Sequence, residues 1–165
     1  TELVEYRRGD ILSSCSLSLG SLSLFSRYVS RLHPTREERR AIRGQIREQL
    51  ERHVPQPPAI RHACGVGGTA RAARKVANLL FQRPRECHVL SARELRQLVK
   101  RLKEPSREDL HLLLKAVPDR VHTLIPGLLV LDTVARAYQL EDIAVSRCGV
   151  REGYLQDRVL GGTAQ

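Results

Sequence analysis

Hydrophobic residues recur at two different spacings along the chain, and the spacing separates expected strands from expected helices. Near the start, Cys15, Leu17 and Leu19 alternate with serines, which predicts a strand with one buried face. Further on, apolar residues such as Leu95 and Leu98 recur every three or four positions, which is typical of amphipathic helices. Strands are expected over residues 3–7, 11–19, 59–66 and 142–146. Helices are expected over residues 22–32, 36–53, 70–81, 93–103, 106–117, 124–138 and 151–160.

Short polar signals mark where several of these elements begin. Arg8-Gly9-Asp10 separates the first two strands and predicts a hairpin turn. Thr35 with Glu38 forms a capping box, in which two side chains satisfy free amides at a helix start. A serine followed three residues later by an acid, at Ser91 and at Ser106, predicts two more helix starts of this kind.

The order of elements indicates the class of fold. A hairpin, a helix, a strand, a run of helices, a strand and a final helix favour an α/β domain with a mixed sheet flanked by helices. Pro126 is expected near the first turn of its helix, and Gly161-Gly162 is expected to close the last helix. At 165 residues, the chain is expected to form one domain over residues 1–165.

A glycine-rich turn lies between the third strand and the helix that follows it. Gly67 and Gly68 allow a tight turn and a close approach to a ligand, and Thr69 is a good N-cap for a helix over 70–81. Free amides at a helix start bind anions. Arg71 and Arg74 lie in or next to the first turn, where the helix dipole disfavours cations unless an anion is bound. The turn therefore predicts a phosphate site, although many such turns are only connections.

The net charge indicates which class of partner the protein binds, and the cysteines indicate the cellular compartment. A net charge of +10 and a pI near 10.2, mostly from arginine, favour polyanionic partners, whereas a solvated arginine-rich surface is the alternative for each single arginine. No cysteines are spaced for metal binding, and they are expected to be reduced in a cytoplasmic protein; they are Cys15, Cys64, Cys87 and Cys148. We expect no signal peptide and no membrane span, and interpret the chain as part of a longer protein.

Five sequence blocks follow one another along nearly the whole chain. They are Thr-Glu-Leu-Val (1–4), Ser-Leu-Gly-Ser-Leu-Ser-Leu (18–24), Gly-Val-Gly-Gly-Thr-Ala (65–70), Leu-Ile-Pro-Gly-Leu-Leu-Val-Leu (124–131) and Ile-Ala-Val-Ser-Arg-Cys-Gly-Val-Arg-Glu-Gly-Tyr-Leu (143–155). In this order they resemble the exopolyphosphatase / guanosine pentaphosphate phosphohydrolase (Ppx/GppA) family, and the last block is the most distinctive. Its Arg-Glu-Gly-x-Leu ending resembles this family rather than sugar or acetate kinases of the same superfold.

The resemblance implies an actin-like fold of two ribonuclease-H-like domains with a cleft between them, of which this chain would be the second. The family's phosphate loop is D-x-G-G-G-S-T-E, and only Thr1 and Glu2 match it, so the first strand with its phosphate loop is expected to be missing. Glu2 would match an active-site acid that works with Mg²⁺; a frayed terminal residue is the alternative. Because one carboxylate binds Mg²⁺ poorly, no cofactor is expected in this chain alone.

The resemblance also implies a set of phosphate-binding residues. Gly67, Gly68 and Thr69 match the family's second phosphate loop, and Arg120 falls where an arginine faces the cleft, although a surface arginine would also explain it. Ser21, after a further glycine turn, is a weaker ligand candidate.

The implied reaction is hydrolysis of a terminal phosphoanhydride, in polyphosphate or guanosine pentaphosphate, with guanosine tetraphosphate as a related ligand. The missing first domain would be needed, so this chain alone is expected to be inactive. A non-catalytic basic module for polyanions or nucleic acid is the alternative, without specific nucleic-acid recognition. The missing strand would leave two unpaired edges, which either pair with each other or are filled in a homodimer.

Overall fold

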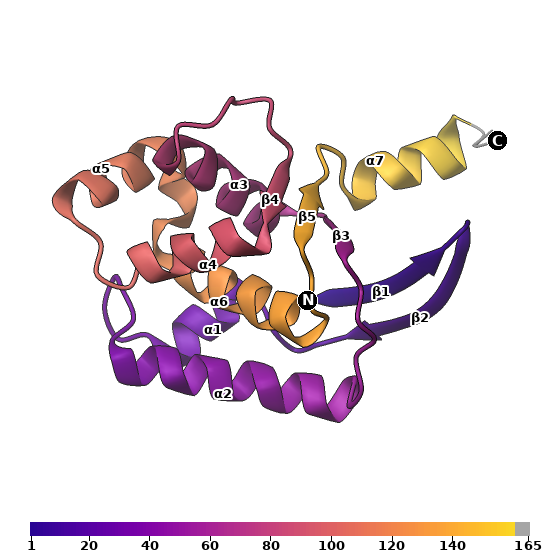
Figure 1. The fold of residues 1–165 in the computed structure, drawn as a ribbon, viewed down its shortest axis with the longest axis horizontal. Helices are drawn as coiled ribbons and strands as arrows, with labels where there is room; N and C mark the ends of the chain where they lie inside the picture. Colours follow the sequence, from indigo (N-terminus) through magenta and orange to yellow (C-terminus); the bar gives the residue numbers. More distant parts are fainter. Residues whose placement is uncertain (161–165) are drawn as a thin grey trace.

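Helices and two small sheets surround one hydrophobic core in the computed structural model, which describes residues 1–160 (Figure 1). The strands are β1 (Glu2–Arg7), β2 (Asp10–Ser16), β3 (His62–Gly65), β4 (Val89–Ser91) and β5 (Asp142–Val145). The helices are α1 (Ser21–Tyr28), α2 (Arg36–His53), α3 (Gly68–Leu80), α4 (Ala92–Arg101), α5 (Arg107–Ala116), α6 (Val121–Ala137) and α7 (Val150–Tyr154). A 3₁₀ turn (Pro118–Arg120) precedes α6, and a π-helical turn (Leu155–Val159) follows α7. The predicted closing pair Gly161-Gly162 lies outside the described residues.

The strands form a mixed sheet and a separate hairpin. In the three-stranded sheet, β5 lies in the middle, parallel to β3 and antiparallel to β4. β1 and β2 pair only with each other, through a turn in which Arg8 and Gly9 both have positive φ, at 52° and 100°. The α/β class with a mixed sheet and flanking helices is confirmed. No ladder joins β1 to β3 in the described chain, so the direct pairing of two edges that the sequence allowed does not occur.

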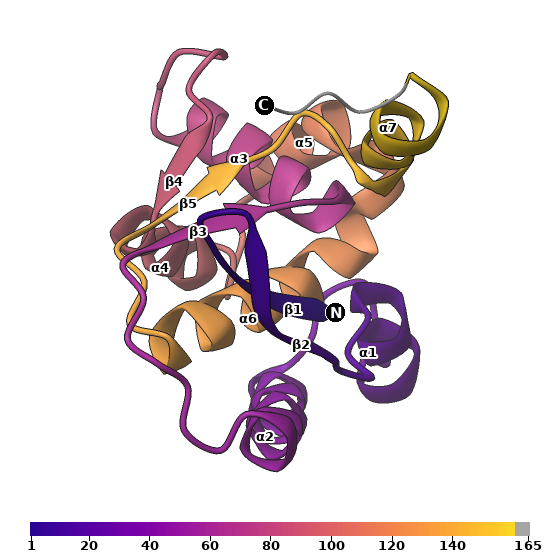
Figure 2. The same cartoon turned by 90° about the vertical axis from the view of Figure 1, so that its right-hand side faces the viewer.

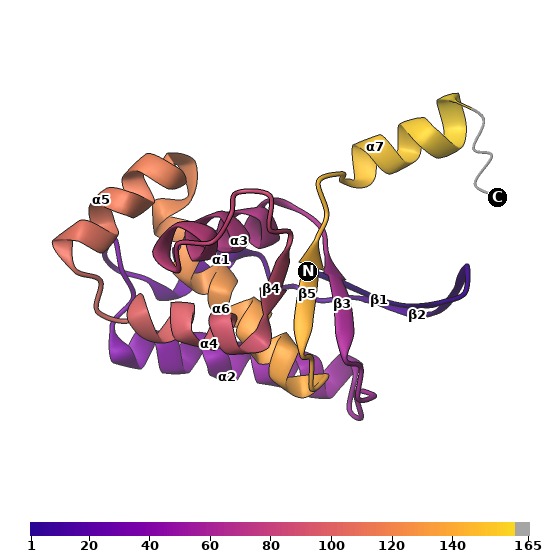
Figure 3. The same ribbon diagram turned by 45° about the horizontal axis from the view of Figure 1, so that its top comes forward.

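Helix α6 lies in the middle of the molecule and contacts α1, α2, α3 and α4 (Figure 2). Its sequence is apolar on nearly all sides, and most of its residues are buried. Such a helix is stable only where neighbours cover every face, which places it at the centre of the core. In contrast, α7 projects from the end of β5, away from the other helices (Figure 3).

Most predicted elements are present with shifted ends. Strand β4 was not predicted, because it is three residues long and only Leu90 in it is buried, so it has no alternation to detect. The strand predicted over 59–66 is His62–Gly65, because β5, its only partner within residues 1–160, starts at Asp142 opposite His62. The strand predicted over 11–19 ends at Ser16, although Leu17 and Leu19 are buried as expected.

The helix ends differ for identifiable reasons. The helix predicted over 22–32 ends at Tyr28, because Ser30 donates both its amide and its hydroxyl to Glu38, at 2.9 and 2.8 Å, and so holds the chain in a turn. The helix predicted over 124–138 begins at Val121, directly after the 3₁₀ turn, so Pro126 lies in its second turn and not its first. The three predicted capping boxes are confirmed.

Candidate phosphate-binding site

Two glycine turns lie side by side at one edge of the mixed sheet. Because β3 and β5 are parallel and in register, with Gly65 opposite Val145, both strands end at the same edge. The Ser146 amide donates to the Gly65 carbonyl at 3.0 Å and holds the two turns together. Open α/β sheets bind ligands at this kind of edge, and the two turns lead directly into α3 and α7.

The turn after β3 brings the chain abruptly into α3. Gly67 has φ of +107°, a backbone conformation that side chains disfavour, and it is the N-cap of the helix. The predicted role of Thr69 as N-cap is therefore wrong: the positive φ at Gly67 lets the helix begin at Gly68, and Thr69 is the second helical residue. Nothing lies within 4 Å of where a Gly67 side chain would be, so this side of the turn is open.

Arg120 lies directly against the first residue of α3. A β-carbon built on Gly68 would lie 2.7 Å from the Cζ atom of Arg120 and 3.1 Å from its Nε atom, so the Arg120 side chain would have to shift to make room for it. The guanidinium donates to no acceptor within residues 1–160, and the free amides at the start of α3 lie beside it. The structure thus brings Arg120 and Gly68 together, although Arg120 belongs to the 3₁₀ turn before α6 and Gly68 begins α3.

Thr69 and Ser21 meet over Gly127, at the starts of two helices. A β-carbon on Gly127 would lie 2.5 Å from Cγ2 of Thr69 and 3.3 Å from Cβ of Ser21. Ser21 is the first residue of α1, so the amino ends of α1 and α3 converge on the same glycine of α6. Two helix dipoles with their positive ends together favour an anion. Neither hydroxyl has a hydrogen-bond partner in the described part of the chain.

The sequence reasoning missed Gly127. A glycine inside a helix costs about 1 kcal/mol of stability relative to alanine. Its presence in the apolar run 124–131 was therefore a signal that another segment packs closely against the helix at this position.

Glu2 lies at the start of β1 and is held in place rather than frayed. The Ser16 hydroxyl donates to Glu2 Oε1 at 2.8 Å. The terminal amine of Thr1 donates to the carbonyls of Leu17 and Leu19, each at 3.0 Å, so the start of β1 runs beside the segment that leads into α1. Glu2 is therefore anchored close to the chain segment that carries Ser21.

The surrounding edge of the sheet is positively charged. Arg71 is exposed close to Glu152, whose pKa is lowered by hydrogen bonds from its own amide and from that of Gly149, and further by nearby arginines. Arg74 does not face the turn but contacts His88 Nδ1 at 2.8 Å. Arg147 approaches the other ring nitrogen of His88 at 2.7 Å, and burial and both guanidinium groups lower the pKa of that histidine. The permanent positive charge here therefore comes from arginine.

The described residues do not by themselves fit Mg²⁺. No group of three or more His, Cys, Asp or Glu side chains lies close enough to hold a metal ion within residues 1–160. Glu2 is the one carboxylate that the sequence predicted for this site, and Mg²⁺ requires several oxygen ligands in octahedral arrangement.

The chain belongs to the Ppx/GppA phosphatase family, whose sequence model matches residues 1–161. It is similar to the crystal structure of the Aquifex aeolicus member of that family, with a TM-score of 0.79 and 20% identity, covering 99% of this chain and 54% of that one. It is also similar to an exopolyphosphatase from Cytophaga hutchinsonii, with a TM-score of 0.77 and 17% identity, covering 93% of this chain and 52% of that one. At these identities the structures show the fold.

The chain therefore spans about half the length of the solved structures it resembles. No curated protein matches it. Within residues 1–160, no helix combines the length and the apolar character needed to cross a bilayer, and the four cysteines are free thiols.

Proposed function

We propose that this chain is the phosphate-holding domain of a phosphohydrolase that removes the terminal phosphate of polyphosphate or guanosine pentaphosphate. The observation that carries the proposal is the position of the Arg120 guanidinium, which lies against Gly68 at the amino end of α3. A planar guanidinium beside free helix amides matches the oxygens of a phosphate group in both charge and geometry.

The other candidate residues extend this arrangement. Thr69 and Ser21 place two hydroxyl groups, which lack protein partners within the described residues, where α1 and α3 converge. In a chain of linked phosphates, Gly67, Gly68 and Arg120 would hold one phosphate, and these hydroxyls would donate to its neighbour. Holding the substrate in one position and neutralising its charge are the main contributions that a protein makes to phosphoryl transfer.

Glu2 is the catalytic residue of the proposal, in the sense that its carboxylate would face the reacting phosphate and contribute one oxygen to Mg²⁺. The remaining ligands would come from the substrate and from the first domain of the parent protein. With one carboxylate in the site, we expect no release of orthophosphate by the 165-residue chain alone. The proposal places the protein in the cytoplasm, where its thiols would remain reduced.

We also propose a homodimer, because two strands have an open edge at which a second copy of the chain could pair. β1 and β3 each pair on one side alone, so each presents an edge that another strand can join. Sedimentation equilibrium at increasing concentration tests this pairing separately from ligand binding.

Calorimetric titration with inorganic triphosphate tests the proposed site. We expect saturable binding to the wild-type chain and a loss of about tenfold in affinity in Arg120→Gln, since one charge-assisted contact is removed. Arg93→Gln, which removes the same charge from the exposed face of α4, is the matched control and should bind like the wild type. Equal affinities for all three chains would reject the site.

A purely nucleic-acid-binding module is less well supported. The family match covers residues 1–161 and identifies a phosphatase domain. Only 4% of the residues are aromatic, which leaves little for bases to stack on.

A further inference from the structure

A row of arginines lies along α2, away from the glycine turns. The row follows the helical repeat, so its members project from one side of the 18-residue helix; they are Arg36, Arg39, Arg40, Arg43 and Arg47. From Arg36 to Arg47 the row extends about 16 Å along the helix axis. A surface of this length and one sign of charge suits an extended anion better than a single small ion.

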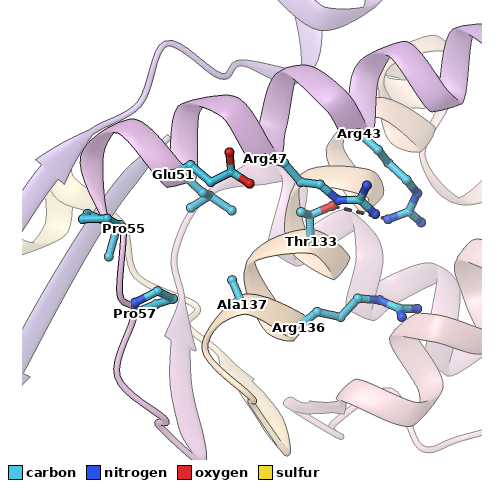
Figure 4. Close-up of a pocket in the computed structure, with 10 residues that line it drawn as sticks. Arg43, Arg47, Glu51, Pro55, Pro57, Thr133, Arg136 and Ala137 are labelled. Carbon is cyan, nitrogen blue, oxygen red and sulfur yellow. Dashed lines mark hydrogen bonds between the residues drawn. The ribbon is translucent and has the colours of Figure 1, made fainter.

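The row borders two adjoining hollows of about 510 Å³ each. Arg43 and Arg47 line both hollows, so the two form one groove between α2 and α6, with the loop after α4 at one end. Figure 4 shows Arg43, Arg47 and Arg136 extending along this groove beside Thr133. Its charged lining consists of seven basic side chains, the five of the row with Lys103 and Arg136, and two acidic ones, Glu51 and Glu104.

Part of the row is fixed in position by the protein. Arg43 donates to Asp132 Oδ2 at 2.9 Å and to the Thr133 hydroxyl at 3.3 Å, and Arg136 donates to Asp132 Oδ1 at 3.2 Å. Asp132 is 1% exposed and is the only carboxylate that these two guanidinium groups share in the described chain. Two cations on one buried anion leave an excess of positive charge in the floor of the groove.

Arg39 is also held by the protein, since it donates to the carbonyls of Pro34 and Lys103 at 2.6 and 3.1 Å, whereas the other three arginines of the row have no partner in the described chain. Arg36, Arg40 and Arg47 donate to no side chain or carbonyl within residues 1–160. Their guanidinium groups are therefore free to contact a ligand without breaking an interaction that holds the fold.

We propose that this groove is a second binding site, which holds an extended chain of inorganic polyphosphate at a distance from the glycine turns. This inference rests on the proposed function, since it assumes that a polyphosphate chain is the ligand. No aromatic residue lines either hollow, so the groove offers phosphate contacts but nothing on which bases of RNA could stack. Arginine binds phosphate oxygens through two parallel hydrogen bonds, which suits a ligand made only of phosphates.

The test compares a groove variant with a charge-matched control. Arg40→Gln/Arg47→Gln removes two unpartnered arginines of the groove, and Arg93→Gln/Arg96→Gln removes two exposed arginines of α4. With end-labelled long-chain polyphosphate, we expect the groove variant to bind about tenfold more weakly. Its salt slope should fall by about 1.4, as expected for two lost phosphate contacts on a flexible chain. The control should stay within twofold of the wild type, and both variants should keep the wild-type melting temperature.

The outcomes separate this inference from the proposed function. Triphosphate is too short to span the groove, so its binding should be unchanged in Arg40→Gln/Arg47→Gln and weakened in Arg120→Gln. Absence of triphosphate binding would reject the phosphate site at the glycine turn, but the polyphosphate measurement would still test the groove. Equal losses of polyphosphate binding in the groove variant and the α4 control would overturn the groove. Single-stranded RNA of the same phosphate number that displaces polyphosphate equally well would overturn the choice of ligand.

Discussion

Gly127 of α6 and Thr69 of α3 touch so closely that a β-carbon on the glycine would lie 2.5 Å from Thr69 Cγ2. The contact sets the distance between the central helix and the turn that begins α3. Because Thr69 follows Gly68, any displacement here also moves the amides that the proposed site uses. The glycine is therefore a positioning element for a site to which it contributes no side chain.

Gly127→Ala should destabilise the protein by up to about 2 kcal/mol. Alanine favours a helix over glycine by about 1 kcal/mol, but overpacking against Thr69 and Ser21 costs about 1–3 kcal/mol. Urea unfolding gives the difference, and triphosphate titration should show weaker binding by the folded variant. Gly44→Ala is the control, since Gly44 lies in α2 with nothing within 4 Å of the new methyl group. It should stabilise the protein, and a stabilised Gly127→Ala variant would contradict the packing argument.

Gly67 and Gly68 should respond differently to alanine. At Gly67, φ of +107° disfavours any side chain although the space is open, so Gly67→Ala should cost about 1–2 kcal/mol of stability. At Gly68 the obstacle is the flexible Arg120 side chain, which can move aside. Gly68→Ala should leave the melting temperature nearly unchanged and weaken triphosphate binding as much as Arg120→Ala does. The double variant should bind no more weakly than either single variant, whereas additive losses would show that the two residues act independently.

His33 should make the fold sensitive to mild acid. Both of its ring nitrogens are buried without a partner in the described chain, and burial lowers its pKa below the ordinary value. The unfolded chain therefore takes up this proton at higher pH than the folded chain. The stability from a neutral His33 is complete above its ordinary pKa of about 6.5 and is lost as the pH falls through the lower folded value.

The measurement is the change in melting temperature between about pH 7.5 and pH 5.5, in wild type and in His33→Phe. The wild type should lose more, since phenylalanine has no proton to bind. His88, whose pKa is lowered by burial and two arginines, acts in the same direction in both proteins and cancels in the comparison. Equal losses would show that His33 does not titrate with folding.

Removing the buried carboxylate of Asp132 should cost more stability than removing the acid of an exposed ion pair. Its carboxylate is 1% exposed and pairs with Arg43 and Arg136, so Asp132→Asn leaves the Arg43 guanidinium, itself mostly buried, without its anion. We expect a loss of about 3 kcal/mol in the free energy of unfolding. Glu48→Gln, which breaks the exposed pair with Arg52, should cost less than about 0.5 kcal/mol. Similar losses in the two variants would contradict the role of burial.

Local signals in the sequence predicted much of the fold. Some features depend only on interactions between residues at most four positions apart, so the sequence alone determines them. They are the capping boxes at Thr35, Ser91 and Ser106 and the turn at Gly9. The five blocks in order predicted the family, and the family match confirms it.

Features that depend on how distant segments cross could not be read in the same way. Thr69 had the right chemistry for an N-cap, but the positive φ of Gly67 ended the turn earlier. Arg74 was expected to lie in or next to the first turn of its helix, but its contact with His88 appears only once β4 pairs with β5. A solvated surface was the alternative for each single arginine, and the groove beside the arginine row on α2 exists only where α6 packs against that helix.

The most direct test of the central claim is the set of backbone amide signals that shift when triphosphate is added to the isotopically labelled chain. The account predicts saturable shifts of the amides of Gly68, Thr69 and Ala70, which disappear in Arg120→Gln. The amides along α2 should remain unchanged at the same ligand concentration. Saturable shifts confined to α2, or no shift at the start of α3, would contradict the assignment of the glycine turn as the phosphate-binding site.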